Sequence, residues 1–218
     1  LHLNTILRRQ RQMCIRDRIG NGVVLDLTAF QKEVAGLKER GVDITPSNLY
    51  ISDRATIILP LHQSLDELRE NNNLIKIGTT KRGIGPAYED KVGRRAIRLC
   101  DLFDKEKLKK KIEILLNHHN AIMRGFGLDE YNLEEVVSEI YKLGEYAKPF
   151  AKTINDITNV INSGKEKILF EGAQGFLLDI DHGTYPFVTS SNVHASYASI
   201  GSGLNPKVIN HILSLIHI

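Results

Sequence analysis

Short apolar runs alternate with amphipathic segments along the first third of this sequence, and this alternation narrows the choice of fold. The runs at residues 22–25, 48–51 and 56–59 have the length of buried strands. After the first run a helix is predicted that begins at an N-cap of Asp26 or Thr28 and stops at Gly41, with an apolar face of Phe30, Val34 and Leu37. Another helix is predicted to begin at Ser64. Strands that alternate with helices indicate an α/β protein with a mostly parallel central sheet flanked by helices.

The second half of the chain is predicted to be mostly helical at first and rich in loops later. Residues 105–161 carry two apolar faces at helical spacing, and residues 167–170 are predicted to form a short strand that runs into 171–175. The hydrophobic content of 42% and the charged content of 25% are typical of a folded globular protein. Apolar runs stay far below the ~20 residues that a membrane helix needs, so we expect no membrane association.

Both ends of the sequence have an unusual origin. Residues 13–18 and 213–218 are translations of the two strands of one short DNA, AGATGTGTATAAGAGACAG, which resembles an adapter of transposon sequencing libraries. We therefore interpret residues 1–18 and 213–218 as non-native tails that form no part of the fold. Residues 19–212 are then expected to be an internal piece of a longer protein. A genuine basic N-terminal arm is the alternative.

The tails also carry the apparent basicity. The chain has 29 basic and 26 acidic residues, but residues 1–18 hold five arginines and one aspartate, so 24 against 25 remain and the net charge becomes −1. A nucleic-acid partner is therefore not expected. The two cysteines, Cys14 and Cys100, cannot form a disulfide framework, which favours a cytoplasmic location.

A glycine-rich basic segment at residues 76–95 is the first candidate site. Its glycines allow backbone amides to approach an anion, Thr79 and Thr80 add donors, and five cations surround them: Lys81, Arg82, Lys91, Arg94 and Arg95. This pattern suits a phosphorylated small molecule, although a glycine-rich connector with solvated cations is equally consistent with it. It is not a Walker loop.

Two further candidate sites follow later in the chain. In residues 170–175, Gln174 could read the edge of a base, and Glu171 could be a base, a magnesium ligand or a loop anchor. In residues 179–191, the spacing of Asp179, Asp181 and His182 does not match a zinc site, so an Asp–His pair that supports the loop is predicted. The hydroxyl groups of residues 189–191 are candidate donors to a phosphate or a base. His118 and His119 are predicted to be a surface pair.

These segments together resemble one family, adenylosuccinate synthetase. The resemblance rests on collinear motifs: Ile19-Gly-Asn-Gly-Val-Val-Leu25, Ile77-Gly-Thr-Thr80, Arg82-Gly-Ile-Gly-Pro-Ala-Tyr-Glu-Asp-Lys-Val92, Phe170-Glu-Gly-Ala-Gln-Gly175, Asp179-Ile-Asp-His-Gly-Thr-Tyr-Pro186 and Val188-Thr-Ser-Ser-Asn192. Phe176 and residues 193–196 depart from the family pattern, and so does Lys81.

The resemblance implies a P-loop-NTPase-like synthetase fold, incomplete in this chain, and a homodimeric, Mg²⁺-assisted enzyme. Such an enzyme transfers the γ-phosphoryl group of GTP to the 6-oxygen of IMP, and L-aspartate then displaces the phosphate. Thr80 and Thr189 would bind the IMP phosphate, Arg94 would reach the same phosphate across the dimer interface, and Gln174 and Lys91 would be catalytic, with Gln174 also contacting the hypoxanthine.

The family's Gly-Asp-Glu-Gly-Lys-Gly-Lys loop with its catalytic aspartate, its catalytic histidine and its C-terminal GTP- and aspartate-binding motifs do not occur in this sequence. No metal ligand is therefore expected in this chain, and the chain alone is expected to be inactive. A non-catalytic purine-nucleotide-binding module and an unrelated phosphate-binding α/β enzyme are the alternatives.

Overall fold

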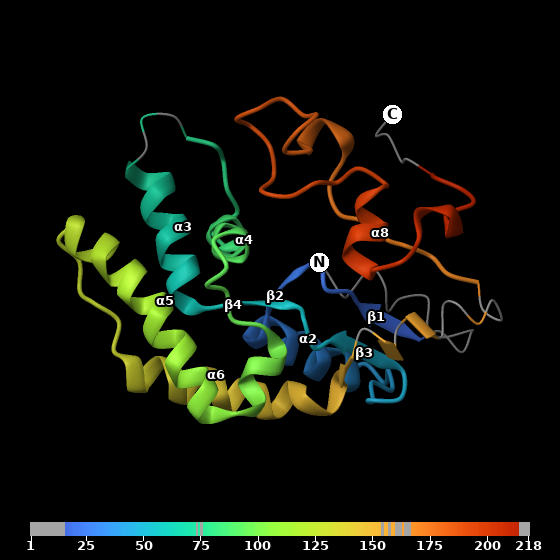
Figure 1. Ribbon diagram of the computed structural model, residues 1–218, viewed down its shortest axis with the longest axis horizontal. Helices are drawn as coiled ribbons and strands as arrows, with labels where there is room; N and C mark the ends of the chain where they lie inside the picture. The colour runs from blue at the N-terminus through green and yellow to red at the C-terminus, as the bar shows by residue number, and fades with distance from the viewer. Residues whose placement is uncertain are drawn as a thin grey trace.

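This chain folds into parallel strands flanked by helices, as predicted from the sequence. The computed structural model describes residues 16–72, 74, 76–153, 155–156, 158–159, 163 and 167–213 (Figure 1). In a three-stranded sheet, β3 (Leu49–Ser52) lies between β1 (Asp17–Ile19) and β5 (Ala151–Lys152). In a second sheet, β2 (Val24–Asp26) pairs with β4 (Thr56–Ile58). All three strand pairs are parallel, which confirms the predicted fold class.

Helix α2 (Leu27–Glu39) forms where a helix was predicted after the first apolar run. The Asp26 carboxylate accepts hydrogen bonds from the amides of Thr28 and Ala29 at 2.8 and 3.0 Å, so it caps the helix. The predicted apolar face is buried, and the ring of Phe30 packs edge-on against that of Phe150 at 5.5 Å.

The next two helices begin where the sequence analysis did not place them. Helix α3 (Pro60–Asn72) begins at Pro60 rather than at Ser64, because the missing amide of a proline costs nothing in the first turn of a helix. Helix α4 (Ile84–Val92) lies within the glycine-rich segment 76–95, and the short η2 (Leu99–Phe103) follows it.

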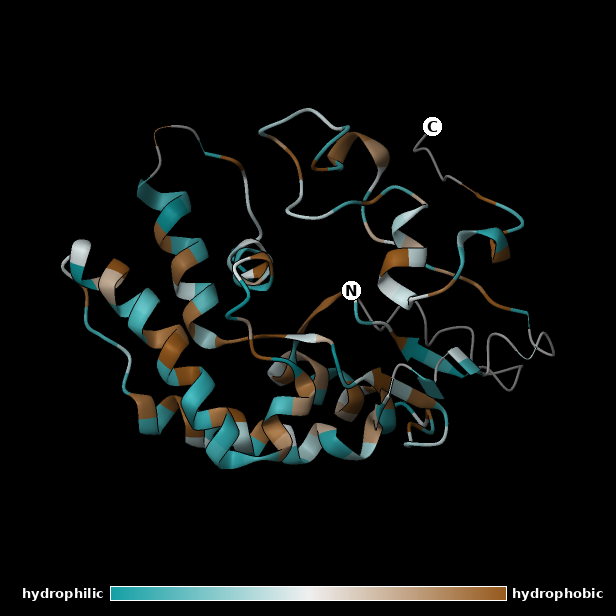
Figure 2. Cartoon of the chain, in the orientation of Figure 1, coloured by the Kyte–Doolittle hydropathy of each residue, from teal (hydrophilic) through white to brown (hydrophobic). Residues whose placement is uncertain are grey.

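Two long helices complete the core. Asp104 caps α5 (Lys105–Gly125) and Asn132 caps α6 (Leu133–Ala147), each through its side-chain oxygen. Apolar residues gather where α2, α5 and α6 approach one another (Figure 2). The one-turn η3 (Lys148–Phe150) and strand β5 interrupt the region that was predicted to be helical as far as residue 161.

The C-terminal part differs more from expectation. Residues 167–170 form no strand, and Leu169 is 76% exposed, because a strand needs a neighbour for its backbone groups and no described segment pairs with this one. Only short elements follow: η4 (Phe176–Leu178), α8 (Tyr197–Ser202) and η5 (Pro206–Val208).

The expected boundary of the N-terminal tail needs a correction. Asp17 and Arg18 belong to β1 and pair with Leu49 and Tyr50, so these two residues take part in the sheet. Backbone pairing needs only an available strand edge, whatever the origin of the residues. Residues 1–15 and 214–218 lie outside the described residues, and their adapter origin stays a prediction. Within the described residues, no helix has the length and hydrophobicity to span a membrane.

The packing of α6 on η2 yields a stability prediction. A Cβ at Gly144 would lie 2.6 Å from the Cβ of Leu102, so Gly144→Ala should lower the free energy of unfolding by about 1–3 kcal/mol. In the matched variant Gly36→Ala the nearest atom is 4.0 Å away, and helix propensity should raise stability by about 0.5–1 kcal/mol. Urea denaturation of both variants measures this, and equal effects would contradict the packing.

Candidate functional site

A cleft of about 790 Å³ lies between helices α3 and α4 on one side and the loop-rich residues 180–197 on the other. Its lining combines hydroxyl and amide side chains with Tyr88 and Lys91 of α4. Segments far apart in the sequence therefore meet here, since residues 77–92 and 180–197 face one another (Figure 1).

The start of α4 is docked tightly on α3 through Gly83. This residue is in the left-handed region at φ +74°, and a Cβ there would lie 2.7 Å from backbone atoms of His62 and Gln63. Its amide donates to the Asp66 carboxylate at 2.9 Å. Two residues later, the side chain of Ser190 lies close to Gly85, so the opposite wall touches α4 directly.

The carbonyl oxygen of Gly22 accepts hydrogen bonds from side chains of two helices, α4 and α8. Tyr88 Oη donates to it at 3.0 Å, Lys91 Nζ at 3.2 Å and Tyr197 Oη at 3.5 Å. The Gly22 amide in turn donates to the carbonyl of Gly201 in α8 at 3.2 Å. The loop that precedes β2 therefore ties α4 to α8.

Burial changes the acid–base properties of both α4 side chains. It raises the pKa of Tyr88 to about 12, with help from the neighbouring Tyr197, so this hydroxyl remains a donor at neutral pH. Burial, together with the charge of Arg98, lowers the pKa of Lys91. Lys91 is thus an incompletely solvated cation at the cleft, and an anionic group would compensate it.

Asp179 organises the wall opposite α4. Its carboxylate accepts the backbone amides of Asp181, His182, Val193 and His194, which draws two stretches of loop together. Burial raises its pKa, but these hydrogen bonds outweigh burial and hold the pKa below its ordinary value. The predicted Asp–His contact therefore runs through the His182 backbone, while the His182 ring stacks on Phe176.

The residues predicted from the family resemblance fall in different places. Lys91 lines the cleft, whereas Thr80, Arg94, Gln174 and Thr189 do not, although their neighbours Thr79 and Ser190 do. Arg94 and Gln174 have φ angles of +61° and +60°, and Lys81 beside Thr80 has +54°. Strained backbone of this kind is concentrated at functional sites. All three positive-φ residues other than glycine in the described chain therefore coincide with, or adjoin, predicted site residues.

The cleft carboxylates do not fit a magnesium site. Asp66 and Glu70 accept backbone amides, Asp181 accepts the Asn192 side chain, and Glu89 pairs with Arg69 at 2.6 Å. Mg²⁺ needs carboxylate oxygens that are open to it in octahedral geometry. Glu171, one of whose alternatives was a magnesium ligand, is exposed and outside the cleft lining.

The prediction of a surface histidine pair is wrong for His119. His118 is exposed, but His119 is 1% exposed, and its Nε2 lies 2.8 Å from Oδ2 of the buried Asp90. His62 of α3, which the sequence analysis did not single out, reaches the same oxygen at 3.0 Å. The signal was present in the sequence, because His119 continues the buried face of Ile112, Leu116 and Met123 at spacings of three and four.

Comparison with known proteins gives one family. The sequence model described as adenylosuccinate synthetase matches residues 5–217. The fully ligated adenylosuccinate synthetase of Plasmodium falciparum superposes with a TM-score of 0.77 and 32% identity, over 88% of this chain and 45% of that one. A succinoaminodeoxyadenylate synthetase of cyanophage S-2L, bound to dGMP and dATP, matches with a TM-score of 0.55 and 19% identity, over 89% of this chain and 42% of that one, and shares the fold. This chain thus spans less than half the length of either protein.

The buried His62 predicts a pH dependence of stability. Burial is the largest cause that lowers its pKa below 6.5, so the unfolded chain binds a proton more readily than the folded chain. Stability should therefore be complete above the unfolded pKa and should fall as the pH drops below it, by at most ~1.4 kcal/mol per pH unit for this group.

His62→Gln keeps an N–H donor toward Asp90 but cannot titrate. Its free energy of unfolding should fall less steeply than that of the unmodified chain between about pH 7.5 and about pH 5.5. Urea denaturation across this range measures the two slopes, and identical slopes would show that His62 does not titrate as its burial requires.

Proposed function

We propose that this chain forms the IMP-binding part of an enzyme that joins IMP and L-aspartate. The basis is that the chain belongs to the adenylosuccinate synthetase family. The product is adenylosuccinate, and GTP supplies the driving force. The enzyme is a C–N bond-forming ligase of AMP biosynthesis and works in the cytoplasm.

The reaction has a simple chemical logic. The 6-oxygen of IMP is a poor leaving group, and transfer of the γ-phosphoryl group of GTP turns it into a good one. The amino group of aspartate then displaces phosphate from 6-phosphoryl-IMP. Phosphoryl transfer depends on positioning and on charge neutralisation more than on covalent help from the protein. When bound, Mg²⁺ supplies that neutralisation at the GTP phosphates, outside the cleft carboxylates described here.

One observation carries the proposal. The motifs at residues 82–92 and 188–192 line one cleft, and the motif at residues 19–25 contacts its Tyr88 and Lys91 through the Gly22 carbonyl, although the three motifs lie far apart in the sequence. Their meeting point presents the Lys91 ammonium group and a row of hydroxyl groups, a combination that suits a phosphorylated purine.

The individual roles follow the family resemblance. Thr80 and Thr189 bind the 5′-phosphate of IMP, and Gln174 contacts the reacting edge of the hypoxanthine. Lys91 acts at the cleft as a cation. Arg94 is exposed and does not line the cleft of its own chain, which supports a contact with IMP in the partner subunit of a homodimer.

A non-catalytic purine-nucleotide-binding module is the second candidate. Both candidates bind IMP, and only the ligase, in its full-length form, makes adenylosuccinate.

We expect this chain alone to form no adenylosuccinate from IMP, GTP and aspartate with Mg²⁺. The acid–base residues that the family resemblance assigns to catalysis do not occur in the sequence, and such groups contribute ~10²–10⁴-fold. Chromatography of the reaction mixture measures the product, while calorimetry tests whether IMP binds. Turnover at an enzyme-like rate would refute the division of labour between this chain and the rest of the enzyme.

Arg94→Leu in the full-length enzyme should raise the KM for IMP and leave the KM for GTP nearly unchanged. Loss of a charge-assisted contact of ~1.5–3 kcal/mol corresponds to roughly 10- to 150-fold. Arg124→Leu, which removes an exposed arginine at the end of α5, is the control and should change neither constant.

The shared site can be tested by mixing subunits. Arg94→Leu subunits mixed with subunits that carry Gln174→Ala should regain activity, because one site of the hybrid dimer is intact. Hybrids that form but remain inactive would place Arg94 in its own subunit's site.

A further inference from the structure

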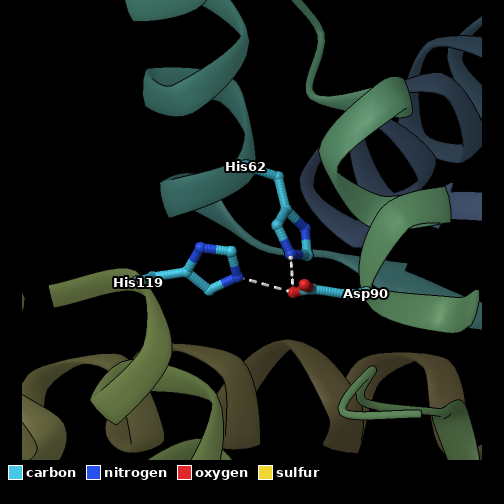
Figure 3. Close-up of side chains that lie close together, drawn as sticks. All are labelled: His62, Asp90 and His119. Carbon is cyan, nitrogen blue, oxygen red and sulfur yellow. Dashed lines mark hydrogen bonds and ion pairs between the residues drawn. The ribbon is translucent and has the colours of Figure 1, made fainter. Parts of the chain in front are cut away.

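Three side chains from three helices meet at one buried carboxylate. His62 comes from α3, Asp90 from α4 and His119 from α5, and both imidazole rings point at the Asp90 carboxylate (Figure 3). Their Nε2 atoms lie 3.0 and 2.8 Å from the same oxygen, Oδ2. The three residues are 0–1% exposed, so water does not share these contacts.

The backbone assigns the protons in this cluster. The amide of Leu59 donates to His62 Nδ1 at 3.0 Å, so that nitrogen carries no proton and Nε2 donates to Asp90. His119 Nδ1 has no partner among the described residues, and its Nε2 also donates to Asp90. Burial opposes ionisation of Asp90, but the two histidine hydrogen bonds outweigh it and keep its pKa below the ordinary value.

This arrangement does not suit a metal ion, although three ligand atoms lie within 4.8 Å of one another. A histidine that binds a metal through Nε2 carries a proton on Nδ1 and donates it to a second partner. At His62, the Leu59 amide occupies that position as a donor, so both groups would present protons to each other. The cluster is therefore a carboxylate held by two N–H donors.

The other oxygen of Asp90 holds the turn that follows α4. Arg95 Nε forms an ion pair with Oδ1 at 2.6 Å, although the two atoms do not have the geometry of a hydrogen bond. The Asp90 carbonyl accepts hydrogen bonds from the amides of Arg95 and Ala96 at 3.1 and 3.2 Å. The guanidinium group folds back over Gly93, where any Cβ would collide with it. Arg95 is thereby fixed on both its backbone and its side chain.

Arg94 is the residue that this turn exposes. It lies between Gly93 and the anchored Arg95 at φ +61°, a left-handed conformation that is unfavourable for an arginine. Such a conformation persists only where its surroundings enforce it. The contacts of Asp90 with Arg95 and Ala96 are the surroundings that do so here.

We propose that Asp90, which accepts hydrogen bonds from His62 and His119, is a positioning residue. It anchors Arg95 and so presents Arg94 outward for the phosphate of a bound nucleotide. This inference rests on the proposed function, in which Arg94 binds the phosphate of IMP. Neither histidine nor Asp90 lines the cleft.

The test is a double-mutant cycle in the full-length enzyme. Arg95→Met removes the ion pair between the buried carboxylate and the turn, and it keeps both histidine N–H donors to Asp90. If the turn then holds Arg94 in the competent conformation about a tenth of the time, the KM for IMP should rise about 10-fold and the KM for GTP should not change. Combined with Arg94→Leu, the Arg95 substitution should add nothing further, since its effect passes through Arg94.

Histidine variants test the buried end. His119→Leu should raise the KM for IMP, His119→Gln should largely restore it because glutamine keeps an N–H donor, and the adjacent exposed His118→Leu should leave it unchanged. An unchanged KM for IMP in Arg95→Met, or full additivity with Arg94→Leu, would overturn the positioning role. If Arg94→Leu itself has no effect on IMP, the proposed contact of Arg94 fails and the inference falls with it. If Arg94→Leu raises the KM for IMP and Arg95→Met does not, the positioning role is refuted while the proposed contact of Arg94 with IMP stands.

Discussion

The buried carboxylate of Asp90 holds together the part of this chain that builds the cleft. A carboxylate without partners in the protein interior would cost several kcal/mol, and here Arg95, His62 and His119 compensate it. Because these partners come from α3, α5 and the turn after α4, the single charge fixes three helices relative to one another. Loss of any one partner would leave the charge incompletely compensated, so the arrangement of the helices depends on all of them together.

Helix α4 connects the buried Asp90 to the cleft. Asp90 faces the core, while its neighbours Tyr88 and Lys91 reach the Gly22 carbonyl and so connect α4 to the loop before β2. That loop contacts α8 through Gly201, and Asp179 ties together the loop that faces α4. The loop before β2 thus links α4 to α8, while α3, residues 77–92 and residues 180–197 supply the lining of the cleft.

Local patterns predicted the parts of the fold that local interactions determine. The cap at Asp26 and the apolar face of α2 followed from spacing, and so did the parallel α/β class. The strand predicted at residues 167–170 is absent, because a strand depends on a neighbouring strand that no local pattern reveals. His119 was misplaced because a polar residue type outweighed its position on an apolar face. The motifs indicated which segments form the site, but they could not reveal that Asp90 joins two distant histidines, since that contact exists only after three helices pack.

A structure of the full-length enzyme with IMP would test whether the Asp90 cluster presents Arg94 to the nucleotide. We expect the 5′-phosphate beside Thr80 and Thr189, with Arg94 of the partner subunit in contact and the hydrogen bonds from both histidines to Asp90 unchanged. A phosphate bound elsewhere, or an Arg94 that has left the left-handed conformation while IMP is bound, would contradict it.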